Sequence, residues 1–570
     1  MKTSNKVFGI DLGTTYSCVS YVGETGKPEI VPNDNFERTT PSVVWFDGSR
    51  VVVGADAKEA TKTDPANVCS FIKRSMGDET FYAEYDGTRY SPEEISSFIL
   101  RKLVQDASQT LGEEICDVVI TCPAYFFVKE RNATKRAGEL AGLNVLQIVN
   151  EPTAAAIAYG INGDDERDKT VLVYDLGGGT FDVTSIRFSR DSVDVLCTDG
   201  DHRLGGKDWD DRLVRLLVER FQDETGCDFD VYGSQEALSE LFFVAEKMKK
   251  QLSVRDKASE RVTLEGDSAR IEITRAEFEA ATSDLLSRTL DFTRNAIALT
   301  REKGAFIDEI VLVGGSSKMP AIASSVEREF GIAPKLFEPD EAVAKGAAII
   351  GSNLALQKKL EEKARSRSRG RSTELTLDDM EAVASETGYT LETVQKATRQ
   401  VRNVASKSFG VLTVWDEAAH EAYIDKIIRE DLESVWNAPD NGRRVSNLLY
   451  KNTPLPVIVS DEFSTMIPNQ QTAAIQICEN LADEAESCDG VSTAESTLLA
   501  TKDLPLPPGL PAGAPIKVIF EMSPEGLLTA TATERSSRRG VTITIETGSS
   551  AFSAEEKRRQ EKRCSELTVE

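Results

Sequence analysis

Residues 6–22 read KVFGIDLGTTYSCVSYV, and residues 170–186 read TVLVYDLGGGTFDVTSI. In both stretches an apolar run is followed by Asp-Leu-Gly, by small residues with Thr, and by a second apolar run. Runs rich in Val and Ile on either side of a glycine turn predict β-hairpins. Glycine lets backbone N–H groups close around an anion. Asp11 and Asp175 stand at the strand ends, where a carboxylate is suited to orienting a hydrated Mg²⁺ between phosphates. The repeated order favours a duplicated fold whose two lobes clamp one nucleotide triphosphate, over two unrelated hairpins.

Composition sets the broad class of the chain. Its 570 residues allow about three to four domains at ~150 residues each. Contents of 40% hydrophobic and 28% charged residues are ordinary for a soluble globular protein. No run of eighteen apolar residues occurs, so we expect no membrane-spanning helix and no membrane partner. The opening residues MKTSNKVFGID lack an apolar signal segment, so we expect a cytoplasmic protein.

Charge, cysteine and histidine content exclude several kinds of site. The formal charge of −27 argues against nucleic-acid binding, which needs a basic surface. The nine cysteines include no metal-spaced pair, and Cys18, Cys122 and Cys197 fall inside predicted core strands. Buried thiols in a reducing compartment are the expected reading. Two histidines make a histidine-based metal site or catalytic triad improbable.

The pattern of the chain changes twice. Residues 1 to about 355 alternate strand-like and helix-like segments, which is typical of an α/β domain. Residues 354–405 are charged and poor in strands, and their block RSRSRGRS predicts a solvated, disordered stretch. Thr376 and Thr390 are plausible N-caps of two short helices after that block. From about 406, short alternating runs between Pro and Gly turns predict β-strands.

Six motifs identify a family resemblance. They are IDLGTTYSCV, ITCPAYF, NEPTAAAIAYG, VYDLGGGTFDV, LGGKDWD and VLVGGSSKMP, in this order and at domain-scale spacing. Together they resemble the nucleotide-binding domain of the 70-kDa heat-shock chaperones, the DnaK-like family, over roughly residues 5–352. Actin and the sugar kinases share the phosphate turns but lack the NEPTAAA and PAYF segments in this form. The resemblance implies an α/β two-lobed actin-like ATPase domain, followed here by a helical insert and a β-sandwich peptide-binding domain. The expected boundaries are 1–355 for the ATPase domain, 356–405 for the charged helical insert, 406–550 for the sandwich with an insertion at 415–441, and 551–570 for a truncated terminal helix.

The resemblance also implies ATP hydrolysis with ATP/ADP and Mg²⁺ as the cofactors. Phosphoryl transfer to water depends mainly on positioning and on stabilising charge. Lys73, in SFIKR, matches the family's catalytic lysine, a cation beside the γ-phosphate and the attacking water. By its surroundings alone, this residue would be an ordinary surface lysine. The implied catalytic residues are Lys73, Glu151, Asp182 and Thr180, and Asp11 and Asp175 are implied to hold Mg²⁺ through water.

Residues 240–253 predict a helix with two stripes. Leu241, Ala245, Met248 and Leu252 fall near one stripe, and a polar stripe lies beside it. By composition the polar stripe is a solvated face, whereas the resemblance makes it a wall of the adenosine site. Lys250 and Lys318 stand where planar arginines often stack on adenine in the family, and an ammonium cannot reproduce that stacking. The implied nucleotide contacts are Gly13, Thr14, Thr15, Tyr16, Gly177, Gly178, Gly179, Thr180, Gly205, Gly206, Glu246, Lys249, Lys250, Ser253, Gly314, Gly315, Ser316, Lys318 and Asp340.

The second half of the chain resembles the family less closely. Blocks at 406–414, 452–479 and 504–534 are similar to the family's peptide-binding sandwich, in which an extended peptide occupies a groove with an apolar pocket. Pro123 and Arg131 match a pair that relays the nucleotide state between domains in the family. The candidate groove residues are Phe409, Val411, Phe463, Ala473 and Ile475, and sandwich core is an equally good reading of each.

Three departures from the family bear on function. The short acidic and apolar linker is replaced by 354–405, an insertion occupies 415–441, and no long helical lid follows the sandwich. A flexible charged tether predicts weak coupling between the two halves. The alternative is that the helices at 376–401 dock in place of the linker, with Leu375, Met380, Val383 and Val394 as an apolar face. We expect ATP-dependent binding and release of extended apolar polypeptides, with a J-domain protein and a nucleotide-exchange factor as candidate further partners. The rival hypothesis is a nucleotide-gated scaffold dedicated to one protein partner, and a small-molecule kinase is disfavoured because no substrate domain replaces the sandwich.

Overall fold

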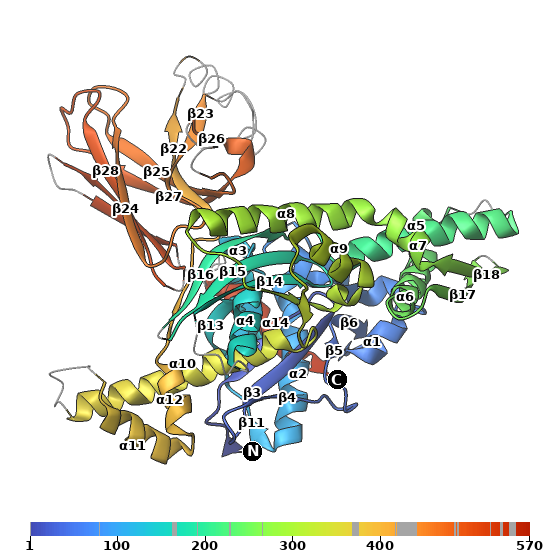
Figure 1. Cartoon of the computed structure of the whole chain (residues 1–570). Helices are drawn as coiled ribbons and strands as arrows, with labels where there is room; N and C mark the ends of the chain where they lie inside the picture. The colour runs from blue at the N-terminus through green and yellow to red at the C-terminus, as the bar shows by residue number, and fades with distance from the viewer. Residues whose placement is uncertain are drawn as a thin grey trace. The chain divides into compact units, whose positions relative to one another are not determined.

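The structure is a computed structural model of the chain, drawn in Figure 1. It describes residues 2–78, 80–161, 168–190, 192–226, 230–264, 266–367, 375–415, 418, 442–483, 486, 489–524, 526–535, 540–545 and 554–570. The chain divides into two units, which are described separately. The first unit comprises residues 1–125, 133–400 and 551–570, and the second comprises 126–132 and 401–550. Both helices and sheets are present in quantity, so the prediction of a mixed α/β chain is confirmed.

Two sheets of the first unit each contain one of the glycine hairpins. The first has the order β13 (Asn144–Asn150), β12 (Asp117–Cys122), β2 (Phe8–Asp11), β3 (Tyr16–Val22) and β4 (Pro28–Val31), with β5 (Thr40–Pro41) also beside β3; the second includes β20 (Lys335–Leu336), β19 (Glu309–Val313), β14 (Lys169–Leu176), β15 (Phe181–Phe188) and β16 (Ser192–Asp201), in that order. In the first sheet β2 and β3 are antiparallel and β12 is parallel to β2. In the second β14 and β15 are antiparallel and β19 is parallel to β14. Both predicted hairpins are therefore confirmed, and both have the same kind of parallel neighbour.

Small residues let two helices approach closely between these sheets. α4 (Glu151–Ile161) and α10 (Ala342–Arg367) are in contact, and α10 also lies against β2 and β3. A Cβ on Gly346 of α10 would lie 1.8 Å from the carbonyl oxygen of Ala154. A Cβ on Gly9 of β2 would lie 2.1 Å from the backbone nitrogen of Ala348. Any side chain at either glycine would force these elements apart.

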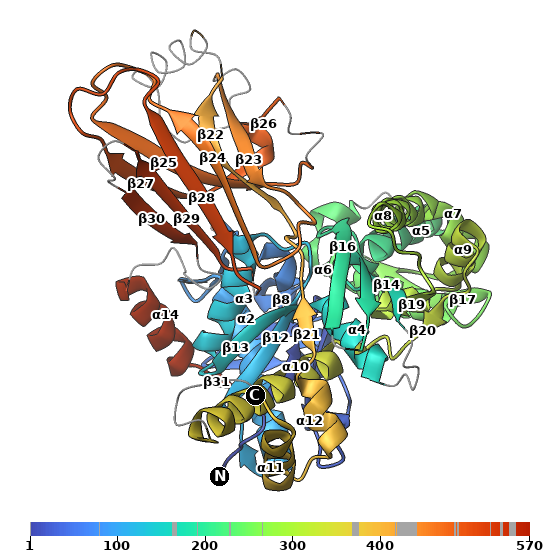
Figure 2. The same cartoon turned by 60° about the vertical axis from the view of Figure 1, so that its left-hand side comes forward.

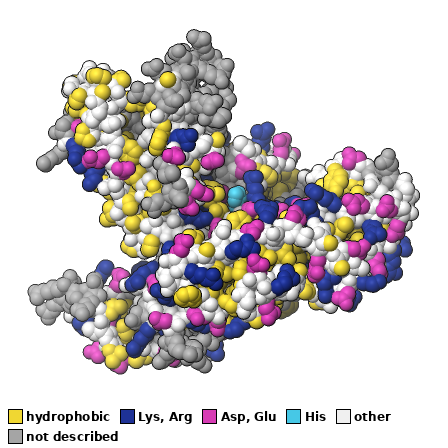
Figure 3. Space-filling view, turned by 45° about the horizontal axis from the view of Figure 1, so that its top comes forward, with side chains coloured by type: hydrophobic (Ala, Val, Ile, Leu, Met, Phe, Trp, Pro, Cys, Tyr) yellow, Lys and Arg dark blue, Asp and Glu magenta, His cyan; other side chains and the backbone are white. Residues whose placement is uncertain are grey.

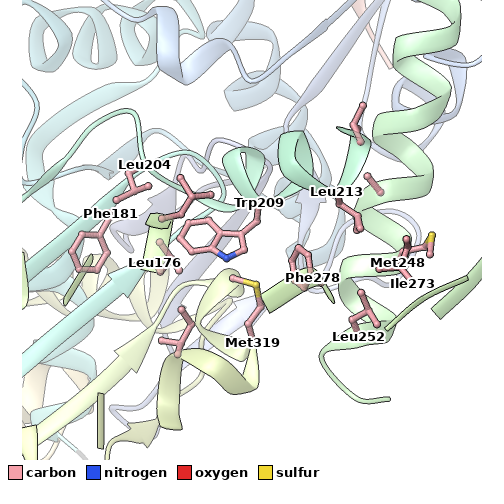
Figure 4. Packing of buried hydrophobic residues seen from close by; sticks show 14 of the residues in the cluster. Leu176, Phe181, Leu204, Trp209, Leu213, Met248, Leu252, Ile273, Phe278 and Met319 are labelled. Atoms are coloured by element: carbon pink, nitrogen blue, oxygen red, sulfur yellow. The ribbon is translucent and has the colours of Figure 1, made fainter. Parts of the chain in front are cut away.

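The second lobe of this unit has its own apolar core, shown in Figure 4. Its elements are α5 (Gly206–Thr225), α6 (Gln235–Leu252), β17 (Lys257–Leu264), β18 (Asp267–Thr274), α7 (Arg275–Ala281), α8 (Ser283–Glu302) and α9 (Pro320–Phe330). The ring of Trp209 on α5 is buried beside Leu176 and Met319. Leu241, Ala245, Met248 and Leu252 of α6 are all buried in this core, so the predicted apolar stripe is confirmed.

A small sheet of the first unit joins segments from distant parts of the sequence. Its strand order is β31 (Thr568–Val569), β7 (Arg50–Val53), β6 (Val43–Asp47) and β8 (Val68–Ser70). The neighbouring elements are α1 (Ala55–Ala60), β9 (Ala83–Tyr85), β10 (Thr88–Tyr90), α2 (Pro92–Leu111), β1 (Lys2–Thr3), β11 (Glu113–Glu114) and α14 (Ala554–Glu566). Ser91 and Glu94 form a capping box at the start of α2, which satisfies two of its free N–H groups. The terminal segment thus belongs to the first unit.

The insert after α10 is folded where the structure describes it. α11 (Leu377–Thr387) and α12 (Leu391–Ala397) begin at Thr376 and Thr390, whose side chains accept the capping hydrogen bonds. Both predicted N-caps are confirmed. Figure 2 shows both helices beside α10. Leu356 and Leu360 of α10, Val383 of α11 and Val394 and Ala397 of α12 form one buried cluster, against which Leu375 and Met380 also pack.

The prediction that 354–405 is a flexible tether is therefore wrong for its described part. α10 continues without a break to Arg367, and a strand, β21 (Gln400–Arg402), follows α12. The physical reason is that Leu, Met and Val recur at helical spacing within the charged sequence and bury together on α10. Residues 368–374, which include the last five residues of RSRSRGRS, lie outside the described residues.

The second unit contains two packed sheets. One has the order β26 (Val491–Ser492), β23 (Arg443–Leu449), β22 (Ser408–Val414), β25 (Thr472–Asn480) and β27 (Ser496–Pro505), and the other has the order β24 (Val457–Ser464), β28 (Pro515–Met522), β29 (Leu528–Glu534) and β30 (Gly540–Ile545). α3 (Val128–Leu140) begins in the part of the chain assigned to this unit. Side chains alternate between core and surface along β28 and β29, as expected of a sandwich with one wet face. Nearly all of the predicted insertion 415–441 lies outside the described residues.

Charged side chains of both signs are mixed on the surface (Figure 3). Figure 3 shows Lys and Arg side chains interspersed with Asp and Glu over the visible face. Among the described helices, none is long and apolar enough to cross a bilayer. Cys18, Cys122 and Cys197 are buried free thiols, as their positions in strands predicted.

Candidate active site

The two glycine hairpins meet at their turns. A Cβ on Gly178 would lie 2.3 Å from the Oγ1 of Thr15, and a Cβ on Gly179 would lie 2.5 Å from the Oγ1 of Thr14. Real side chains never approach so closely, so only glycine fits at these two positions of the second turn. On the first turn, the backbone N–H of Gly13 donates to Ser17 Oγ at 3.1 Å. The structure thus brings together the two segments that were predicted to bind phosphate.

Two further turns close on the same place. The N–H of Gly206 donates to the carbonyl of Gly177 at 2.9 Å, which ties the start of α5 to the second hairpin. The hydroxyl of Ser316 donates to the same carbonyl at 2.9 Å. A Cβ on Gly205 would lie 2.6 Å from the backbone of Gly179. Segments that include Gly205, Gly206 and Ser316, predicted as nucleotide contacts, therefore pack against the second glycine turn.

A buried ion pair lies beside the turns. Lys73 follows β8 in a short 3₁₀ turn, and Glu151 is the first residue of α4. The Lys73 Nζ contacts Glu151 Oε1, and these residues are only 5% and 7% exposed. Burial lowers the pKa of Lys73, but the charges of Glu151 and Asp11 outweigh it and leave that pKa raised. The lysine is therefore held as a cation.

Carboxylates crowd around this lysine. Burial, and then the charge of Glu151, raises the pKa of Asp11 to about 7, although the hydroxyl of Thr121 donates to Asp11 Oδ1 at 3.3 Å. Burial also raises the pKa of Asp175 well above its usual value, with further contributions from Glu151, Asp182 and Asp11. One lysine does not neutralise so many acids, and raised carboxyl pKa values of this kind are relieved by a nearby cation.

The donor set fits the predicted magnesium. Asp11 and Asp175 supply hard oxygen ligands at the ends of β2 and β14. Within the part of the chain that the structure describes, no three acidic, histidine or cysteine side chains converge to hold a metal ion by themselves. A Mg²⁺ here would therefore depend on water and on phosphate oxygens, as this ion prefers.

Asp182 and Thr180 complete the predicted catalytic set. Asp182 lies opposite Asp175 in the β14–β15 ladder and is 1% exposed. Its Oδ1 accepts a hydrogen bond from the N–H of Tyr125, at 3.2 Å. Thr180 is also buried, and its carbonyl accepts from the N–H of Gly177 at 3.0 Å. The PAYF segment thus fixes the orientation of one of the candidate water-orienting carboxylates.

The predicted adenosine residues form a charged network around Tyr16. The Tyr16 hydroxyl donates to Glu246 Oε1 at 3.2 Å, and Lys250 donates to the hydroxyl at 2.9 Å. Lys250 also pairs with Glu246 at 2.7 Å. Burial raises the pKa of Glu246, but Lys58 and Lys250 outweigh it and lower that pKa to about 2. Glu246 is therefore ionised under all ordinary conditions.

Other predicted nucleotide contacts have protein partners. Lys249 donates to the carbonyl of Gly206 at 3.0 Å and pairs with Asp210 at 2.7 Å. Lys318 forms an ion pair with Asp340, and both side chains are nearly half exposed. The hydroxyl of Ser253 donates to the carbonyl of Lys249 at 3.1 Å. Gly314 has a φ of +79°, in the region that favours glycine, and the turn that it forms continues through Gly315 to Ser316.

Three residues of the site, Lys58, Arg74 and Asp208, were not predicted from the sequence. Lys58 Nζ reaches both Glu246 and the Tyr16 hydroxyl, the latter at 3.0 Å. Arg74 donates to the carbonyl of Gly179 at 3.0 Å and pairs with Asp208 at 2.5 Å. The signal for the last two was available, since Arg74 follows Lys73 in SFIKR and Asp208 lies in LGGKDWD. Lys58 stands in ADAKEA, a segment with no distinguishing pattern.

The predicted relay and groove residues are placed as follows. Pro123 is buried in the first unit, and Arg131 donates to the carbonyl of Phe126 at 3.4 Å in the second. A relay between them stays a prediction.

In the sandwich, four of the five candidate groove residues are buried in the core, and Phe463 packs against it partly buried. The four are Phe409, Val411, Ala473 and Ile475, each no more than 9% exposed. In this structure they serve as core, because alternate residues of β22 and β25 face inward.

Comparison with known proteins identifies the family to which the chain belongs. The family model of the Hsp70 protein matches residues 7–84 and 78–364. A chaperone protein DnaK of Halobacterium salinarum is 35% identical over 553 residues, which are 96% of this chain and 76% of the relative. The protein of the same name from a second strain of that organism matches equally well. The match extends beyond the ATPase motifs through the sandwich, and the chain belongs to the Hsp70 family.

Proposed function

We propose that this protein is an ATP-dependent molecular chaperone that binds and releases extended apolar polypeptide segments while hydrolysing ATP to ADP and phosphate. The single observation that carries the ATPase part is the buried Lys73–Glu151 ion pair beside two facing glycine turns. A cation, carboxylates and backbone N–H groups in one place are what transfer of a phosphoryl group to water requires. Membership of a family whose relatives carry the name chaperone protein DnaK supports the peptide-binding part.

Each group of the site has a role in this proposal. The other N–H groups of the two glycine turns would hold phosphate oxygens, because those of Gly13 and Gly177 donate within their own turns. Lys73 would stabilise the negative charge that develops on the transferred phosphoryl group. Glu151 and Asp182 would accept hydrogen bonds from the attacking water and so orient it. Burial of all three side chains strengthens these interactions, because little water is present to screen them.

Asp11 and Asp175 would hold Mg²⁺ through water molecules. When bound, the ion would neutralise charge on the phosphate oxygens. The raised pKa values of both carboxyl groups support this assignment, since burial and then the neighbouring carboxylates disfavour their charged forms unless a cation lies nearby.

The sandwich would supply the peptide site, for which exposure of a groove is needed. Because the candidate residues on β22 and β25 are core in this structure, peptide binding requires the strand edges or loops of the sandwich to move apart. A J-domain protein and a nucleotide-exchange factor are proposed as further partners, on the strength of the family.

Stimulation of the ATPase by peptides tests the proposal. Steady-state hydrolysis by the full chain is measured with a panel of unrelated apolar peptides and with charged peptides of matched length. The Lys73→Ala variant is the control for contaminating ATPase. Broad stimulation by the apolar peptides supports a chaperone. Hydrolysis without stimulation by any peptide would favour the dedicated scaffold, and no hydrolysis above the control would overturn the ATPase.

A further inference from the structure

Residues 554–570 dock onto the first unit at a site prepared for them. β31 pairs in parallel with β7, so that Val569 lies opposite Val51. The N–H of Glu570 donates to the carbonyl of Val51 at 2.9 Å, and the N–H of Val53 donates to the carbonyl of Glu570 at 2.9 Å. Val569 is buried. The strand therefore covers an edge of β7 that would otherwise expose unpaired backbone groups.

The helix before this strand is held by α2. Cys564 of α14 is fully buried, with its sulfur 3.7 Å from the hydroxyl oxygen of Ser97. Arg563 pairs at 2.7 Å with Glu94, whose side chain is almost completely buried. Arg101 donates to the carbonyl of Cys564 at 2.7 Å, where α14 approaches its end. Figure 2 shows α14 and β31 in this part of the unit. Backbone pairing, burial and charge thus hold one segment at one place.

The docked segment connects to Lys73 through the sheet. β7 pairs with β6, and β6 pairs with β8. β8 ends at Ser70, and Lys73 follows within the short 3₁₀ turn Ile72–Ser75. Between them Phe71 has a φ of +58°, a conformation that a bulky side chain seldom adopts. A backbone in such a conformation persists only where the surrounding packing holds it.

A second connection runs through α2. The hydroxyl of Ser96 donates to the sulfur of Met76 at 3.3 Å, and Met76 caps the turn that carries Lys73. Ser97, the next residue of α2, faces Cys564. The first turns of α2 therefore contact both the docked helix and the Lys73 turn. β7 also leads through Gly54 into α1, which carries Lys58 of the Tyr16 network.

We propose that segment 554–570 is a positioning strap, which fixes the arm that carries Lys73 by completing the β31–β7–β6–β8 sheet and bracing the start of α2. This inference rests on the proposed ATP hydrolysis. The strap acts on the hydrolysis step, because a displacement of about 1 Å of a catalytic group can slow a reaction by about 10²-fold. The glycine turns that would hold phosphate lie on β2–β3 and β14–β15 rather than on β8, so the hydrolysis rate should fall further than the affinity for ATP.

The test releases the strap in the full chain. Cys564→Asp places a charge in the buried contact with α2, and Ser565→Asp, at the exposed neighbouring position, is the matched control. Val569→Asp attacks the strand independently. We expect single-turnover hydrolysis of bound ATP to slow about ten-fold in both buried-site variants, with ATP affinity within two-fold of the original and the control unaffected. The Cys564→Ser variant, which adds no charge at this position, should keep most of the original hydrolysis rate.

Two further measurements separate positioning from general damage. Hydrogen exchange should show residues 68–78 losing protection in the strap variants while β14 and β15 keep theirs. In a Lys73→Ala background, releasing the strap should slow the residual hydrolysis no further. If both Asp variants fail to fold, the same hydrolysis and hydrogen-exchange measurements are made on Arg563→Ala, which places no charge in the buried contact.

Several results would overturn the strap. One is an unchanged hydrolysis rate in a variant for which hydrogen exchange shows that the strap has come away. Another is a loss of ATP affinity as large as the loss of rate. A third is a further slowing when the strap is released in the Lys73→Ala variant. Failure of the original protein to hydrolyse ATP would instead remove the proposed function, and protection of 68–78 would then still decide whether the strap orders the arm.

Discussion

Removing the ammonium group of Lys73 is the perturbation whose size the structure fixes best. The Lys73 side chain is 5% exposed, and its Nζ contacts Glu151. Asp11 raises the pKa of Lys73, and Lys73 lowers that of Asp175. Lys73→Ala leaves these carboxylates without their cation. Loss of one preorganised charge from a reaction centre costs on the order of 3 kcal/mol in the transition state, so hydrolysis should slow by roughly 10²-fold or more. Breaking one side of a buried ion pair should also lower the free energy of unfolding by about 3 kcal/mol.

Two assays and one control check this. Single-turnover hydrolysis of prebound ATP measures the chemical step, and equilibrium denaturation without nucleotide measures stability. Lys62→Ala removes a lysine that is about one-third exposed, pairs with Glu59 and lies over the Phe243 ring. It should leave hydrolysis unchanged and lower the free energy of unfolding by at most about 1 kcal/mol. Hydrolysis by Lys73→Ala within a few-fold of the original protein would refute the role of this lysine, whatever happens to stability.

Three other predictions follow from the same contacts. Burial raises the pKa of Asp11 from 3.8 to about 7, so the unfolded chain ionises this carboxyl first, and the nucleotide-free protein should lose up to about 4 kcal/mol of stability between about pH 4 and pH 7. Denaturation of Asp11→Asn should show a flatter profile there, and an unchanged slope would contradict the shift. Replacing Lys250 and Lys318 together by Arg should tighten ATP binding by about 1 kcal/mol in calorimetric titration, since a planar cation stacks on adenine and an ammonium does not; unchanged or weaker binding would remove them from the adenine walls. Val394→Asp should destabilise the first unit by about 3 kcal/mol, because it buries a charge in the cluster on α10, whereas Gln395→Asp at the exposed neighbour should not; equal effects would count against the docked insert.

Local patterns predicted the parts of this structure that local physics determines. The two hairpins follow from Val and Ile runs around glycine turns, and the buried stripe of α6 follows from its helical spacing. The caps at Thr376 and Thr390 were also foreseeable, because a threonine before a helix accepts a backbone hydrogen bond within the same few residues.

Contacts between distant segments were not predictable in this way. The apolar face of the insert, Leu375, Met380, Val383 and Val394, was recognisable in the sequence as an alternative to a flexible tether. Its packing on Leu356 and Leu360 of α10 appears only in the folded chain. The docked 554–570 segment has even less of a signal, since β31 pairs over two residues and the charged helix buries scattered residues such as Gln560 and Cys564 rather than an apolar stripe. The network of Lys58 with Tyr16 and Glu246 joins three segments whose relation appears only once the chain is folded.

Peptide release in the two nucleotide states tests the central claim most directly. A fluorescent apolar peptide is bound to the full chain, and its dissociation rate is measured by competition with ATP present and with ADP present, using charged peptide as the binding control. The account predicts release about five-fold or more faster with ATP than with ADP, within the usual range of coupling between two sites. Equal dissociation rates, with ATP hydrolysis intact, would contradict ATP-dependent binding and release.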